Sequence, residues 1–144
     1  MTRCVTTGIV SLTVPFMDNA IAAAGRPTIM IVDNDLLLSS LLEAVFKDEG
    51  LHVLTSANGQ EALDLLGTVK APQLILSDMN MPVMGGAELF KCLKSKLATK
   101  NIPIILSSAL EDIEVTSQEL GASACLKKPY DLEALTNLVK KHLN

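Results

Sequence analysis

The sequence has few aromatic side chains and no tryptophan. Three phenylalanines and one tyrosine occur among its 144 residues. Surfaces that bind single-stranded nucleic acid or sugars by ring stacking need several exposed aromatic rings. Such a surface has almost nothing from which to be built in this chain.

Cysteine is also scarce, and the spacing of the cysteines matches no disulfide or metal-binding pattern. Cys4, Cys92 and Cys125 are odd in number, widely separated and without a C-x-x-C pair. Neither a disulfide framework nor a zinc site is indicated. We therefore expect reduced thiols and a cytoplasmic protein.

Positive charge is in the minority, with a net charge of −4 and a sequence pI near 5.1. The lysines look spread along the chain, which argues against a nucleic-acid surface and favours a protein or a small anion as partner. The length suits one domain, and an apolar share of 49% permits a substantial core.

Residues 1–26 mix Gly, Ser, Thr and Ala without a helical or strand period, so we expect a flexible leader before a domain at 27–144. Two alternatives are a signal peptide cleaved after Ala24 and a translation start at Met17. Pro15 and Asp18 interrupt the apolar stretch, which argues against the signal peptide. The stretch is too short and too polar to span a bilayer, so no membrane partner is expected.

From Pro27 onward, short apolar runs alternate with longer segments of helical period, which predicts five β-α units. In the first helix, Leu37, Leu41, Leu42, Val45 and Phe46 are expected on one buried face. The predicted strands cover 29–32, 52–55, 74–77, 104–107 and 124–127. The predicted helices cover 36–49, 60–66, 87–94, 113–120 and 132–142.

The strands read as continuous aliphatic runs, which indicates a parallel sheet with helices on both faces. In such sheets ligands bind beyond the carboxyl ends of the strands. Four strand ends carry polar groups. These are Asp33-Asn34-Asp35, Asp78, Ser107-Ser108 and Lys127-Lys128.

The groups expected at this edge suit phosphoryl chemistry. A carboxylate can accept a phosphoryl group if a metal or a lysine neutralises the combined negative charge. Carboxylates after the first and third strands form an oxygen site suited to Mg²⁺. A lysine and a hydroxyl can contact phosphoryl oxygens.

The same residues carry a resemblance over Thr28 to Leu143. Val32-Asp33-Asn34, Ser77-Asp78-Met79-Asn80-Met81-Pro82, Ser108-Ala109 and Lys128-Pro129-Tyr130, in this order, resemble the receiver domain of two-component response regulators. The resemblance implies an α/β, flavodoxin-like (CheY-like) fold with strand order 2-1-3-4-5. It also implies that the Lys128-Pro129 peptide bond is cis, as this bond commonly is in the family.

The resemblance further implies that a histidine kinase or a histidine phosphotransfer protein phosphorylates the domain, which is not otherwise an enzyme. Asp78 matches the phosphoacceptor, Asp33 an acidic Mg²⁺ ligand, Ser108 the switch hydroxyl and Lys128 the family's lysine. The backbone carbonyl of Asn80 matches a further metal ligand.

Two positions depart from the family pattern. Asn34 stands where most active receivers have a second acid, so we expect it to ligate Mg²⁺ without charge and to weaken the metal site, unless Asp35 reaches it. Asp35 is equally suited to cap the first helix. Cys125 replaces an aromatic switch residue and is too small to act as the same rotor.

We expect a stand-alone receiver that signals by altered protein binding through its fourth and fifth β-α units. One alternative is a degenerate receiver that binds partners without phosphorylation. A weaker one is a haloacid-dehalogenase-like phosphatase, because Asp33-Asn34-Asp35 resembles that family's D-x-D motif. Leu37 does not fit that motif, and the Asp78 loop would be unexplained.

Overall fold

The computed structural model describes residues 25–143, where five strands and five helices alternate along the chain. The strands are β1 (Thr28–Val32), β2 (His52–Ser56), β3 (Leu74–Asp78), β4 (Ile104–Ser108) and β5 (Ala124–Lys127). The helices are α2 (Leu36–Asp48), α3 (Gly59–Leu66), α4 (Gly86–Lys94), α5 (Ile113–Leu120) and α6 (Leu132–Leu143). Each predicted element is present, and the bounds differ by at most one residue at either end. The predicted leader lies outside the described residues, apart from Gly25 and Arg26.

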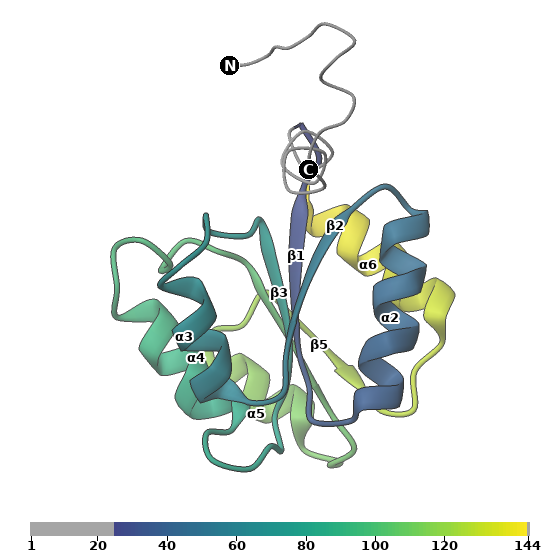
Figure 1. The fold of residues 1–144 in the computed structure, drawn as a ribbon. Helices are drawn as coiled ribbons and strands as arrows, with labels where there is room; N and C mark the ends of the chain where they lie inside the picture. Colours follow the sequence, from purple (N-terminus) through teal and green to yellow (C-terminus); the bar gives the residue numbers. More distant parts are fainter. Residues whose placement is uncertain (1–24, 144) are drawn as a thin grey trace, which may run out of the picture.

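The five strands form one parallel sheet in the order β2-β1-β3-β4-β5. Helices α3, α4 and α5 cover one face, and α2 and α6 cover the other (Figure 1). This arrangement confirms the predicted flavodoxin-like fold. Among residues 25–143, no helix combines the length and the apolar character needed to cross a membrane.

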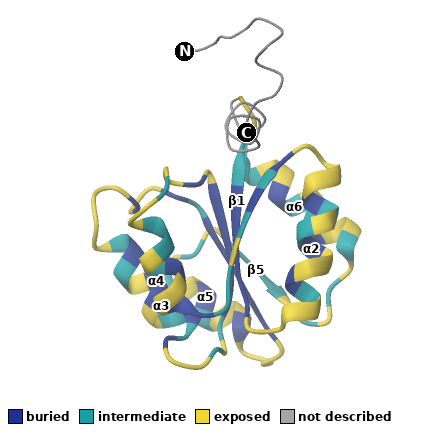
Figure 2. Cartoon of the chain, viewed as in Figure 1, coloured by how far each residue is buried: buried dark blue, intermediate teal, exposed yellow. Residues whose placement is uncertain are grey.

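The sheet separates two hydrophobic clusters, because neighbouring side chains on a strand point to opposite faces. In β1, Met30 and Val32 join the cluster beneath α3, α4 and α5, whereas Ile29 and Ile31 join the cluster beneath α2 and α6. The central strands are buried along their length (Figure 2). Burial on both faces explains the continuous aliphatic runs in the sequence.

Helix α2 faces the core with a different stripe from the predicted one. Leu42 and Phe46 are buried, and Leu38 packs partly against them, but Leu37 is 85% exposed and Leu41 48% exposed. The prediction that Leu37 and Leu41 are buried was wrong. Leu36 to Leu38 form an unbroken run of leucines, so the apolar pattern alone does not define where the stripe begins.

The loop that follows β3 is held by close backbone packing. A Cβ atom on Gly86 would meet the carbonyl oxygen of Asp78 and would lie 2.9 Å from the Cα atom of Met79. Within the loop, Val83 has a φ of 68°, and the Met84 N–H donates to the Pro82 carbonyl at 2.7 Å. This is the rarer of the two γ-turn types, in which the central residue has a positive φ. Close packing against the Asp78 strand therefore favours glycine at position 86, where the loop ends.

Substitution Gly86→Ala is expected to destabilise the fold by about 1–3 kcal/mol, because the added methyl group has to displace backbone of the Asp78 strand. Urea unfolding of both proteins measures the difference. Gly67→Ala is the matched control, since its Cβ would lie 3.4 Å from the Asp64 carbonyl oxygen and its φ is −73°. Equal stability of the Gly86 variant and the wild type would contradict the packing argument.

Candidate functional site

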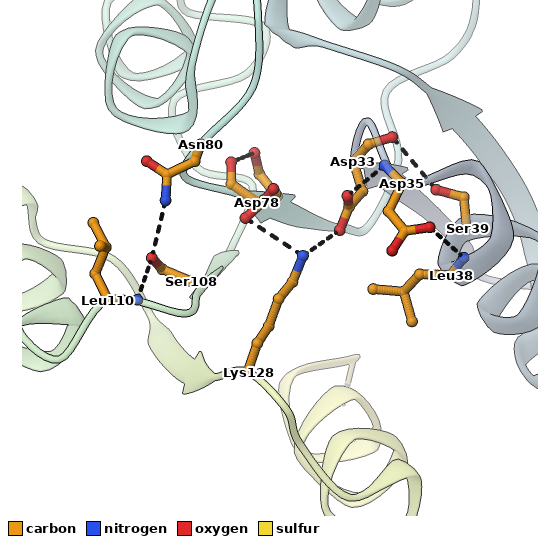
Figure 3. Close-up of polar contacts among 10 residues, drawn as sticks. Asp33, Asp35, Leu38, Ser39, Asp78, Asn80, Ser108, Leu110 and Lys128 are labelled. Carbon is orange, nitrogen blue, oxygen red and sulfur yellow. Dashed lines mark hydrogen bonds and ion pairs between the residues drawn. The ribbon is translucent and has the colours of Figure 1, made fainter.

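The strand register brings the predicted site residues to one edge of the sheet. Val32 pairs with Ser77, Asp78 with Ser107, and Ser108 with Lys127. The backbone ladder continues beyond the strands, because the N–H of Lys128 donates to the Ser108 carbonyl at 2.8 Å. Four side chains from different strand ends meet as a result. They are Asp33, Asp78, Ser108 and Lys128 (Figure 3).

Lys128 lies between the two carboxylates. Its Nζ is 2.9 Å from Oδ2 of Asp33 and 3.6 Å from Oδ1 of Asp78, so it is hydrogen-bonded to the first and ion-paired with the second (Figure 3). Asp33 and Asp78 are both buried. The peptide bond between Lys128 and Pro129 is cis, as the resemblance implied. One ammonium group therefore serves two negative charges.

The surroundings of Lys128 favour its protonated form. Those of Asp78, the candidate phosphoacceptor, disfavour its ionised form. Burial raises the pKa of Asp78; the neighbouring charge of Asp33 also raises it, and the charge of Lys128 lowers it by less than the total rise. Burial alone would lower the pKa of Lys128, but its contacts with Asp33 and Asp78 outweigh that effect and raise it. An added cation at this site would relieve the repulsion between the carboxylates.

Asp35 is committed to the start of α2. Its carboxylate accepts a hydrogen bond from the Leu38 N–H at 3.1 Å, which makes it the N-cap. The Asp35 N–H in turn donates to Oδ1 of Asp33 at 2.9 Å. Asp35 therefore caps the helix, which was one of the two roles expected for it. A D-x-D nucleophile at Asp33 is disfavoured, because Asp33 is ion-paired with Lys128 and Asp35 is bound to the helix.

Asn34 is exposed, between the buried Asp33 and the helix cap. The described residues contain no group of three or more His, Cys, Asp or Glu side chains arranged to hold a metal. Two convergent carboxylates nevertheless fit Mg²⁺, which usually binds one or two carboxylates and keeps several waters. Asp33, Asp78 and the Asn80 carbonyl would hold the ion. Asn34, which stands where most active receivers have a second acid, contributes no charge.

Ser108 is buried, and its Oγ accepts two hydrogen bonds. The Leu110 N–H donates to it at 3.0 Å, and Nδ2 of Asn80 donates at 3.3 Å (Figure 3). With its acceptor positions occupied, the hydroxyl keeps its own hydrogen to donate. The sequence suggested only a backbone role for Asn80. Its side-chain contact with Ser108 was not predicted, because the strand pattern does not define which way a side chain in the following loop turns.

Cys125 and Tyr130 pack on opposite faces of the sheet. Cys125 is partly buried against the cluster beneath α3, α4 and α5, and it pairs with Leu106 in the sheet. Tyr130, to which the sequence assigned no role, packs against the opposite cluster. Burial, followed by the charges of Asp33, Asp78 and Asp35, raises the pKa of Tyr130 from 10.0 to about 12. Its phenol therefore reports on the carboxylates of the site.

The raised pKa of Tyr130 can be measured directly, because the chain has one tyrosine and no tryptophan. Near-ultraviolet absorbance of tyrosinate is expected to titrate with a midpoint of about 12 in the folded protein. The unfolded chain releases this proton at lower pH, so the free energy of unfolding should fall as pH rises from about 10 to about 12. Asp33→Asn should lower the midpoint. A folded-state midpoint near 10 would contradict the geometry.

Known proteins share both the sequence pattern and the fold. A family model described as "Response regulator receiver domain" matches residues 29–140. "Sporulation initiation phosphotransferase F" of Bacillus subtilis is 38% identical over 117 residues, covering 80% of this chain and 92% of that protein. "DNA-binding transcriptional regulator NtrC" of Escherichia coli is 32% identical over 121 residues, covering 83% of this chain but 25% of that protein.

Two solved structures extend the comparison. The chemotaxis response regulator CheY4 of Vibrio cholerae has a TM-score of 0.75 and 28% identity, covering 82% of this chain and 99% of that one. The response regulator protein TrrA of Thermotoga maritima, solved in complex with Mg²⁺ and BeF, has a TM-score of 0.72 and 27% identity, covering 81% and 99%. The edge at which Asp33, Asp78, Ser108 and Lys128 meet thus lies within the matched segment, and the chain belongs to the response regulator receiver domain family.

Proposed function

We propose that this receiver accepts a phosphoryl group on Asp78 from the phosphohistidine of a histidine kinase or a phosphotransfer protein. The observation that carries the proposal is the position of the buried Asp78 carboxylate. It lies at the end of β3 beside Asp33, and Lys128 Nζ is 3.6 Å from one of its oxygens. A carboxylate so placed has a neighbouring cation for an incoming phosphoryl group.

The transfer requires Asp78 in its ionised form. Its carboxylate oxygen forms the new bond to phosphorus as the bond from phosphorus to the histidine nitrogen breaks, and the histidine leaves with the electron pair. Lys128 balances negative charge on the phosphoryl oxygens. Asp33, Asp78 and the Asn80 carbonyl would hold Mg²⁺, which would neutralise acceptor and phosphoryl charge and so offset the burial that disfavours ionised Asp78.

Ser108 connects the phosphoryl group to the surface of the domain. Its hydroxyl hydrogen is available to a phosphoryl oxygen, and its contact with the Leu110 N–H joins it to the segment that leads into α5. Phosphorylation adds close to two negative charges, which is enough to bias a two-state loop. The output is altered binding of a protein partner at the fourth and fifth β-α units.

The names of the relatives support a place in a phosphorelay. One relative is named as a phosphotransferase, and this chain covers nearly all of it. Others are named as DNA-binding regulators of about four times the length of the match. We assign this receiver a protein donor and a protein target in the cytoplasm, with no nucleic acid or membrane contact of its own.

Substitution Asp78→Asn is expected to abolish phosphorylation by acetyl phosphate in the presence of Mg²⁺, because the amide cannot act as the nucleophile. Phos-tag electrophoresis shows the loss as a missing shifted band. Asp64→Asn, which alters an exposed acid on α3, is the control and should label like the wild type. A shifted band in the Asp78 variant would reject the acceptor assignment. No band in the wild type, with either acetyl phosphate or a cognate kinase, would favour the degenerate receiver.

Substitution Asn34→Asp is expected to tighten Mg²⁺ binding by roughly tenfold, since ligand charge governs the affinity of oxygen sites. Amide chemical shifts around Asp78 measure the dissociation constant. Asn101→Asp adds the same charge at an exposed position before β4, at the opposite edge of the sheet, and should have little effect. Equal Mg²⁺ affinity in the Asn34 variant and the wild type would show that this position does not limit the metal site.

A further inference from the structure

A second concave site lies at the amino-terminal ends of the strands, opposite the carboxyl ends where Asp78 lies. A half-open hollow of about 640 Å³ is formed where β1 and β2 begin and where the chain enters β3. Its polar lining includes Arg26, Thr28, His52, Lys70 and Gln73. A five-residue strand spans about 17 Å, so this hollow and the phosphoryl site are separated by the length of the sheet.

The lining of the hollow carries charge of one sign. Arg26 and Lys70 are cationic, His52 adds a titratable ring, and none of the described residues that line the hollow is acidic. The chain as a whole has an excess of acids over bases. The described lining is therefore a local exception to the charge of the protein, and the Lys70 ammonium group favours an anion.

Hydrogen-bond donors also outnumber side-chain acceptors in this hollow. Oε1 of Gln73 accepts the Thr28 N–H at 2.7 Å, which leaves the amide NH₂ of Gln73 as its remaining group. The Thr28 hydroxyl and the Lys70 ammonium add further donors. An anion with several oxygens matches this set, because each oxygen accepts more than one hydrogen bond.

The remaining lining is apolar. Leu54, Val69, Ala71 and Leu143 border the same hollow. A free inorganic ion would leave this surface in contact with water, whereas a molecule with an apolar body would cover it. The hollow thus combines a cationic rim with an apolar wall, a composition typical of sites for small organic anions.

We propose that this hollow binds a small organic anion, with a phosphate or carboxylate group held by Lys70 and Gln73 and an apolar body against Leu54 and Val69. The site requires no phosphorylation of Asp78. Its existence is therefore independent of the function proposed above, and either proposal can fail alone.

Titration of the isotopically labelled full chain with phenyl phosphate, in the absence of Mg²⁺, tests the proposal. Saturable amide shifts are expected at Thr28, His52 and the segment 69–73. Benzyl alcohol, which has a similar body without the charge, should bind at least about tenfold more weakly. Benzoate should shift the same amides if the site accepts carboxylates as well as phosphates.

Charge reversal at Lys70 provides the matched comparison. Lys70→Glu is expected to weaken phenyl phosphate binding by about tenfold or more, whereas Lys91→Glu, at an exposed lysine on α4, should leave it unchanged. The spectra of both variants report whether the fold is intact. Shifts confined to residues around Asp78 and Lys128, absence of saturation, or equal losses in the two variants would overturn the proposal.

Discussion

The arrangement of the carboxyl edge depends on one ammonium group shared by two buried carboxylates. Lys128 satisfies Asp33 with a direct hydrogen bond and Asp78 with a longer ion pair. Without it, two like charges would face each other away from water, which proteins avoid by neutralising one of them. The alignment of β1, β3 and β5 that brings these groups together is thus also what makes their charges tolerable.

Much of this arrangement could be predicted from the sequence, because the signals are local. Aliphatic runs such as Ile29 to Val32 mark buried strands, and the polar residue after each run marks the edge where ligands bind. Asp35 stands at a helix start, where a short acid caps well. The element boundaries and the meeting of Asp33, Asp78, Ser108 and Lys128 at one edge follow from these signals, whereas the strand order came from the family resemblance.

Other features depend on contacts that no local pattern contains. The bond from Asn80 to Ser108 joins residues from two strand ends, and the burial of Tyr130 results from packing after β5. The core stripe of α2 was misjudged because three consecutive leucines fit two stripes. Lysines were also less evenly spread than expected, since Lys91, Lys94, Lys96 and Lys100 fall within ten residues without an intervening acid. The exclusion of nucleic acid therefore stays a prediction.

The γ-turn at Val83 has a consequence for how this loop is encoded. A β-branched residue with positive φ carries a backbone cost on the order of 1–3 kcal/mol, whereas glycine adopts positive φ at less cost. The Val83 side chain is also 80% exposed, so it recovers little of that cost by burial. Folding free energy alone would select against valine here. The fold itself therefore does not require valine at this position.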